Sequence, residues 1–237
     1  VTPEAIQRWK EERGYDKPLV FNRAAPGVAK VTDTVFFDKS VSLFWFEFGS
    51  NYSYLSVMRI EDASLRHGVT VRWKPFLLGP IFRSFGWDTS PFVLQQAKGA
   101  YVWKDMAREC RKYKLPWTQP STFPRAALLP MRVALVGADQ DWMGAYCRRM
   151  MTLHFAQDRA IDSAEVVTKA LLQLGLPAQR IIDEAQSDAN KHKLRAQTEA
   201  ARARGIFGAP TFFVGDEMFW GNDRLDDALI HCVHARA

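Results

Sequence analysis

The chain has 237 residues, of which 47% are hydrophobic and 24% are charged, a composition typical of a soluble globular protein. This length allows one large domain or two closely packed domains, and no apolar run approaches the roughly 18 residues that indicate a transmembrane helix. The formal net charge of +6 suits a small anionic ligand. No cluster of basic and aromatic residues indicates nucleic-acid binding, so neither a membrane nor nucleic acid is an expected partner.

The cysteines and histidines show no pattern typical of disulfides or metal sites. Cys110, Cys147 and Cys232 lie far apart and match neither a disulfide framework nor a zinc motif. We therefore expect reduced thiols in a cytoplasmic protein, and the N-terminus lacks the apolar core of a secretory signal. The histidines form no HxxxH or HExxH pair, so no metal site is expected.

Residues 1–40 differ from the rest of the chain. Thr2 and Pro3 predict a helix start, but the short helix that follows has only Ile6 and Trp9 to bury. Prolines further along then interrupt regular structure. We interpret this segment as an N-terminal arm that packs on the body or on a second subunit of a homodimer. A disordered leader is the alternative.

The most informative stretch follows the arm. Residues 41–48 are β-branched and aromatic with almost no polar interruption, which predicts a strand buried on both faces. Gly49 ends the strand, and apolar residues recur at helical spacing from Ser53 until Gly68 stops the helix. Ser50 therefore lies at a helix N-terminus, where backbone N–H groups and the helix dipole favour an anion. The alternative is that this serine only caps the helix.

A second strand and a long helical segment come next. Residues 69–76 predict a strand that ends at Pro75, and a strand–helix–strand unit with a short return is parallel and right-handed. Residues 86–91 predict a loop. No strand is expected between residues 77 and 188, which we interpret as an inserted all-helical domain. The helices are predicted over residues 95–113, 131–138, 141–156, 163–174 and 177–187.

The C-terminal part returns to mixed structure. Residues 189–204 predict a helix, and residues 211–214 and 217–220 predict two strands joined by a hairpin turn. The last helix covers residues 225–232 or beyond. The order of elements is that of a thioredoxin topology with a helical insertion. The predicted fold class is therefore α/β, a thioredoxin-like fold with an inserted all-helical domain. Its thioredoxin-like part comprises residues 41–76 and 189–237, and the insertion comprises residues 77–188.

Five short motifs in the right order resemble one family over nearly all of residues 40–232. The family comprises 2-hydroxychromene-2-carboxylate isomerases and the related kappa-class glutathione transferases, in the DsbA-like branch of the thioredoxin superfamily. Serines stand where a thioredoxin site has Cys-x-x-Cys, so this site cannot perform dithiol–disulfide exchange. Asn51 stands where family members often have Pro. The motifs are residues 48–55 (FGSNYSYL), 74–79 (KPFLLG), 97–101 (AKGAY), 207–210 (FGAP) and 219–225 (FWGNDRL).

The resemblance implies a glutathione site in the groove between the Ser50 turn and the Pro210 loop. The bond before Pro210 is then cis, and the extended backbone of glutathione pairs with the edge at Ala209. The Ser50 hydroxyl donates a hydrogen bond to the glutathione sulfur. Ser50 is thus expected to stabilise the nucleophile of another molecule and not to act as a nucleophile itself.

The same resemblance places the ends of glutathione. Asn222 and Asp223 hold the γ-glutamyl end beside Arg224, and Lys98 reaches the glycyl carboxylate. Each of these residues has an ordinary structural alternative. Asn222 and Asp223 are suited to cap the last helix, and Lys98 and Arg224 are suited to be solvated charges.

The family reaction interconverts 2-hydroxychromene-2-carboxylate and open-chain trans-o-hydroxybenzylidenepyruvate. Thiolate addition turns the conjugated double bond into a single bond, which rotates before the thiol leaves. The expected function is therefore a glutathione-dependent isomerase in aromatic compound catabolism. A kappa-like glutathione transferase and a non-catalytic thioredoxin-fold binding protein are the alternatives. An aromatic substrate needs an apolar wall, and ordinary core packing is the alternative for each candidate: Phe82, Trp87, Tyr101, Trp103 and Trp220.

Overall fold

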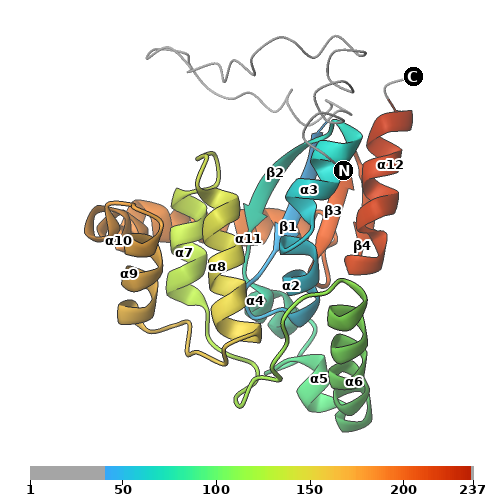
Figure 1. Ribbon diagram of the computed structural model, residues 1–237, viewed down its shortest axis with the longest axis horizontal. Coiled ribbons are helices and arrows are strands. Elements are labelled where there is room, and N and C mark those ends of the chain that lie inside the picture. Colours follow the sequence, from blue (N-terminus) through green and yellow to red (C-terminus); the bar gives the residue numbers. More distant parts are fainter. Residues whose placement is uncertain (1–40, 236–237) are drawn as a thin grey trace. The chain divides into compact units, whose positions relative to one another are not determined.

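The computed structural model of the protein describes residues 41–235. The predicted N-terminal arm, residues 1–40, lies outside these residues. Within the described part, strands β1 to β4 form one sheet with helices on both of its faces (Figure 1).

The sheet has the strand order β2-β1-β3-β4. β1 (Val41–Phe46) pairs in parallel with β2 (Thr70–Pro75) and antiparallel with β3 (Thr211–Val214). β3 then pairs antiparallel with β4 (Glu217–Trp220) through a hairpin. The sequence predicts all of these strands, and Pro75 ends an edge strand, where its missing N–H leaves no partner unpaired.

The helices of residues 77–188 follow one another between β2 and β3, with no strand among them, as predicted. The sequence does not predict α4 and α5, because Gly79, Pro80 and Pro91 interrupt the helical pattern. Both prolines lie in first turns, where a missing N–H costs no helical hydrogen bond. The helices are α2 (Asn51–Val57), α3 (Ile60–His67), α4 (Leu78–Ser84), α5 (Pro91–Leu94), α6 (Gln96–Lys112), α7 (Leu128–Val136), α8 (Met143–Phe155), α9 (Ala164–Gln173), α10 (Ala178–Gln186), α11 (Asp188–Ala203), the 3-10 helix η2 (Asn222–Arg224) and α12 (Leu225–His234).

The single helix expected after Ser50 is two helices. α2 ends at Val57 because the Arg59 N–H donates to the Ser56 carbonyl at 3.1 Å, a tight turn that interrupts the helical ladder. α3 continues from there and ends at Gly68, whose φ of 60° is the left-handed cap that the sequence predicts.

Both faces of β1 are buried, as its apolar sequence predicts. Phe44 and Phe46 lie in the larger core, where Phe44 stacks on Phe212 of β3 at a ring-centroid distance of 5.2 Å. Leu43 and Trp45 face the other side and pack with side chains of α4 and α11. Because side chains alternate across a strand, only a run with few polar residues can be buried in this way.

α3 and α12 lie together over one face of the sheet, and α11 lies behind it (Figure 1). α7 contacts β2 and also α8, α9, α10 and α11, so the inserted helices pack directly on the sheet edge. This arrangement is the predicted α/β, thioredoxin-like fold with a helical insertion. The division of the chain into domains at residues 76 and 188 stays a prediction.

Candidate active site

The turn between β1 and α2 fixes the position of Ser50. Its N–H donates to the Glu47 carbonyl at 3.1 Å, which closes the turn. Ser50 is the N-cap of α2, and its Oγ accepts from the Ser53 N–H at 3.2 Å. The capping role is therefore confirmed, and it leaves the hydroxyl proton for another acceptor.

The hydroxyl proton of Ser50 is directed at the loop before β3. Ser50 Oγ donates to the Ala209 carbonyl at 2.8 Å, and the Ala209–Pro210 peptide bond is cis, as the resemblance implies. The Pro210 carbonyl in turn accepts from the Gly221 N–H at 3.0 Å, next to η2. Three segments that are distant in sequence are thereby held together: the Ser50 turn, the Pro210 loop and the start of η2.

These segments border a pocket of about 1000 Å³. The rest of the pocket surface comes from α4, α5 and α6 and from the loops at residues 87–90 and 123–126. Pro210 is buried and does not itself line the pocket, whereas its neighbour Ala209 does. The other predicted glutathione residues on its surface are Ser50, Lys98, Asn222, Asp223 and Arg224.

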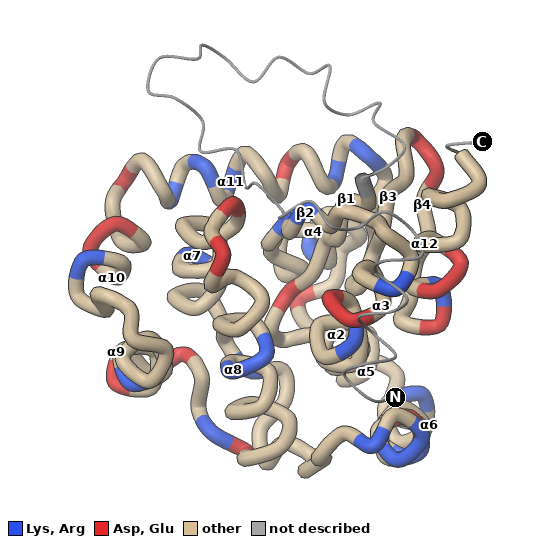
Figure 2. Tube along the Cα trace, turned by 45° about the horizontal axis from the view of Figure 1, so that its top comes forward, with Lys and Arg blue, Asp and Glu red and all other residues tan. Residues whose placement is uncertain are grey.

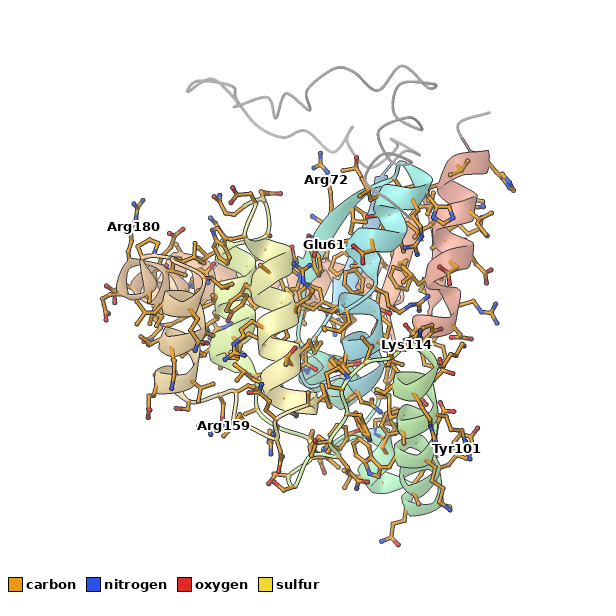
Figure 3. The ribbon with its side chains drawn as sticks, viewed as in Figure 1. Glu61, Arg72, Tyr101, Lys114, Arg159 and Arg180 are labelled. Atoms are coloured by element: carbon orange, nitrogen blue, oxygen red, sulfur yellow. The ribbon has the colours of Figure 1, made fainter. Side chains whose placement is uncertain are left out.

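Four of the five candidate wall aromatics line the pocket: Phe82, Trp87, Tyr101 and Trp220. Tyr101 and Trp220 are 57% and 51% exposed, so neither is a core residue. Figure 3 shows Tyr101 on α6. Trp103 does not line the pocket, because it packs edge-on against Phe123 at a centroid distance of 4.8 Å. For Trp103 the core-packing alternative holds.

Asn222 connects η2 to α2 and α3. Its Oδ1 accepts from Ser56 Oγ at 3.1 Å and from Arg59 Nη1 at 3.0 Å, and the residue is 4% exposed. Neither Asn222 nor Asp223 caps a helix, because η2 and α12 begin without a side-chain cap. Asn222 therefore holds η2 in place from within the protein.

The charged residues of the predicted site are more exposed than Asn222. The Asp223 side chain is 72% exposed and lies 3.5 Å from Arg224, which also pairs with Asp227 at 2.6 Å. Lys98 lies exposed on α6, a helix that carries several Lys and Arg residues (Figure 2). These side chains are accessible to a ligand but are not fixed by the buried network around Ser50.

Sequence reasoning missed Glu47, which also lines the pocket. It is the only charged residue in the apolar run of residues 41–48, which is the signal that could have identified it. Burial raises the pKa of Glu47 from 4.5 to about 8. The carboxyl group of Glu47, which lies beside the Ser50 turn, is thus neutral at pH 7.

Tyr52 and Asp105 form a second pair that was not predicted. Tyr52 Oη donates to Asp105 Oδ2 at 2.8 Å, and both residues line the pocket. Burial, and then this hydrogen bond, raise the pKa of Tyr52 above its usual range. The phenol therefore stays protonated and links α2 to α6.

No cysteine lines the pocket. Cys110, Cys147 and Cys232 are all buried and form no disulfide. Burial raises the pKa of Cys110 to about 12 and that of Cys147 well above its usual range. Within residues 41–235, no group of three His, Cys, Asp or Glu side chains is arranged to hold a metal ion, and no helix is long and apolar enough to cross a membrane.

Comparison with known proteins shows the family to which the chain belongs. A family profile described as a DSBA-like thioredoxin domain matches residues 43–230. The chain therefore belongs to the DsbA-like thioredoxin family. A solved structure of a 2-hydroxychromene-2-carboxylate isomerase superimposes with a TM-score of 0.73 and 25% identity, covering 83% of this chain and 95% of that one.

Relatives with assigned names place the chain within that family. A 2-hydroxychromene-2-carboxylate isomerase of Sphingobium xenophagum is 30% identical over 186 residues, covering 77% of this chain and 93% of that one. The isomerase of Pseudomonas putida is 28% identical, covering 77% of this chain and 89% of that one. Glutathione S-transferase kappa 1 of Caenorhabditis elegans is 24% identical, covering 77% of this chain and 86% of that one. The resemblance carried by the five motifs is confirmed.

Proposed function

We propose that this protein is a glutathione-dependent isomerase. Its substrate is 2-hydroxychromene-2-carboxylate or a related aromatic enone acid, which it interconverts with the open-chain trans-benzylidenepyruvate form. The observation that carries the proposal is the contact of Ser50 with Ala209 in a pocket that no cysteine lines. A thioredoxin-type site with a hydroxyl in place of the thiol can position a sulfur but cannot supply one. The sulfur therefore has to arrive with a ligand.

The groups around the pocket suit glutathione. Ala209 offers its backbone for β-like pairing, Lys98 an ammonium group for the glycyl carboxylate, and Asp223 a carboxylate for the γ-glutamyl amino group. The volume of about 1000 Å³ also leaves room for an aromatic substrate between Trp87, Tyr101 and Trp220. When bound, glutathione supplies a thiolate that adds reversibly to a conjugated double bond.

In the proposed reaction, the Ser50 hydroxyl changes its hydrogen-bond acceptor. In the structure its hydroxyl donates to the Ala209 carbonyl. When a sulfur lies in the pocket, the hydroxyl turns to it, and the Ala209 carbonyl becomes free to accept a backbone N–H of the ligand. A hydrogen bond to a charged acceptor contributes about 1.5–3 kcal/mol. Ser50 thus stabilises the thiolate, and Asn222 keeps η2 where its neighbour Asp223 can reach the ligand.

The relatives support this choice of reaction. The bacterial relatives named 2-hydroxychromene-2-carboxylate isomerase align over most of their own length, and the kappa-class relatives carry glutathione in their name. The buried thiols suit a reducing compartment, and we place the enzyme in the cytoplasm as a homodimer. Light scattering on the full chain tests the dimer by its mass.

Two measurements test the function. Isothermal titration with glutathione should give millimolar or tighter binding, which Asp223→Ala weakens. Absorbance spectra of 2-hydroxychromene-2-carboxylate with the enzyme should then change only when glutathione is present. Conversion at the same rate without glutathione contradicts the cofactor, and binding without conversion contradicts the isomerase.

A transferase is the second candidate, and the kappa-class relatives are the observation that favours it. The same residues hold glutathione in both reactions, and the two differ in whether the adduct breaks down again. Mass spectrometry of the products distinguishes them. A stable glutathione conjugate indicates a transferase, and recovered free glutathione indicates an isomerase.

A further inference from the structure

Glu47 lines the pocket, and the function above gives it no role. We propose that Glu47 is a proton donor in this reaction, and that its carboxyl group hydrogen-bonds to and protonates the carbonyl oxygen of the bound enone acid. This inference rests on the proposed isomerase function.

The position of Glu47 is set by the turn that carries Ser50. The residue directly follows β1, and its backbone carbonyl accepts the Ser50 N–H at 3.1 Å. Its Oε2 lies 3.1 Å from the point where a side chain on Gly49 would begin, beside the Arg125 carbonyl at 3.4 Å from the same point. The carboxyl group therefore occupies the space that the glycine leaves open, next to Ser50 and on the surface of the same pocket.

No neighbouring charge compensates this carboxyl group. Within residues 41–235, no hydrogen bond or ion pair joins the Glu47 side chain to another group of the protein. The Arg125 guanidinium pairs instead with Asp158 and donates to the Arg159 carbonyl at 2.8 Å. His154, whose Nδ1 lies 2.9 Å from the Phe48 carbonyl, has a pKa lowered to about 4 by burial. Its ring is neutral and adds no positive charge.

The protonation state follows from this environment. Burial is the cause that raises the pKa of Glu47 to about 8, so the acid form predominates at pH 7. Other ionisable groups reach the pocket from α2, α6 and η2, and from the loops before α5 and α7. They are Tyr52, Asp88, Lys98, Tyr101, Asp105, Glu109, Lys112, Arg125, Asp223 and Arg224.

A protonated carboxyl group on the surface of the pocket is suited to an enone. Negative charge develops on the carbonyl oxygen when a nucleophile adds to the conjugated double bond, and a fixed donor aimed at that oxygen stabilises it. Glu47 gives its proton to the oxygen as the charge forms and takes it back when the double bond is restored. The O–H bond broken on one partner is formed on the other, so isomerisation consumes no net proton.

The first test needs neither glutathione nor substrate. Infrared difference spectra of the wild type and Glu47→Gln at pH 7 should show a protonated carboxyl band that the variant lacks and that disappears near pH 8. Glu165→Gln, the same change at an exposed position outside the pocket, should remove no such band. An ionised Glu47 at pH 7 contradicts the inference, whatever the function proves to be.

The second test uses the loaded enzyme. Glu47→Gln should lower the isomerisation rate by about 100-fold, the usual contribution of a general acid, with glutathione affinity unchanged. The wild-type rate should fall as the pH rises through about 8, and Glu47→Gln should lose this dependence. Glu47→Asp, which keeps an acid, should retain it at a reduced rate. Failure of the wild type to bind glutathione contradicts the proposed function, whereas an active wild type with an equally active Glu47→Gln contradicts only the role of Glu47.

Discussion

The two sides of the pocket are built by different means. On the side of the sheet, Ser50, Ala209 and Asn222 are buried or nearly so, and each is joined by a hydrogen bond to a segment distant in sequence. On the side of α6, Tyr101 and Lys98 project from a helix surface and are largely exposed. The first side is fixed by hydrogen bonds within the protein, whereas the side chains of the second side extend toward solvent.

This difference suggests that the two sides of the pocket have different functions. A fixed donor loses little entropy when it meets its acceptor, so it can favour the charge that forms during a reaction. Exposed aromatic and charged side chains can bind several related ligands, because each can turn without disturbing the core. Substitutions on the two sides of the pocket test this difference.

Ser50→Ala should cause the largest loss. It removes the donor to the sulfur, so the isomerisation rate should fall by about 100- to 1000-fold, as for the loss of one anion-stabilising donor. Glutathione binding, measured by titration, should persist, because the ends of the ligand are held elsewhere. The lost cap should also lower the free energy of unfolding by about 1 kcal/mol.

Ser53→Ala is the matched control for this variant. The Ser53 hydroxyl is buried without a hydrogen-bond partner and does not line the pocket. Its removal should leave the rate within about threefold of the wild type. Equal losses in the two serine variants would show that the effect comes from disturbing α2 and not from a donor at the sulfur.

Asn222→Ala should mainly affect stability. Its Oδ1 is the acceptor for Ser56 and Arg59, and its loss leaves two donors unpaired in a buried region. We expect a decrease of about 2 kcal/mol in the free energy of unfolding, measured by urea denaturation. Asn222→Asp, which keeps the acceptor, should recover most of it. If the alanine variant is as stable as the wild type, the connection does not hold η2 in place.

Asp223→Ala should affect binding without affecting stability. Its side chain is exposed, so its loss should change the free energy of unfolding by less than about 0.5 kcal/mol. Glutathione affinity, measured by titration calorimetry, should fall by about tenfold, since one charged contact is lost. Asp216→Ala, an exposed aspartate in the β3–β4 turn, should bind glutathione like the wild type. If Asp223→Ala binds glutathione as tightly as Asp216→Ala does, Asp223 does not contact glutathione.

Tyr101→Ala should give the smallest change. The ring is exposed, so the variant should fold normally and bind glutathione as before. The KM for the aromatic substrate should rise by about fivefold as a stacking contact disappears. Tyr101→Phe keeps the ring and should keep the wild-type KM. A rise in KM with Phe as well would assign the effect to the hydroxyl group.

The sheet side of the pocket could be predicted well because its signals are local. An apolar strand, a glycine and a serine-capped helix lie within residues 41–57, and the FGAP motif directly precedes β3. A short pattern of this kind predicts where the backbone turns and which side chain lies at the turn. The contact between Ser50 and Ala209, 159 residues apart, was accessible only through the resemblance to a family.

What could not be predicted depends on burial and on partners distant in sequence. Asn222 has a helix-cap pattern in the sequence, but its partner Arg59 lies 163 residues away. In the sequence, Glu47 is a charged residue near the end of a strand. The burial that raises its pKa depends on residues that only the fold brings around it. Trp103 and Tyr101 lie two residues apart on α6, and only their packing distinguishes the partly buried Trp103 from Tyr101, which lines the pocket.

The placement of the three cysteines has a consequence for how the chain reacts with glutathione disulfide. Glutathione disulfide exchanges with accessible thiolates, but every thiol of this chain is buried, and burial keeps those of Cys110 and Cys147 protonated. The folded chain therefore offers glutathione disulfide no accessible thiolate with which to form a mixed disulfide. Its intact mass, measured by mass spectrometry after incubation with oxidised glutathione, should therefore stay unchanged.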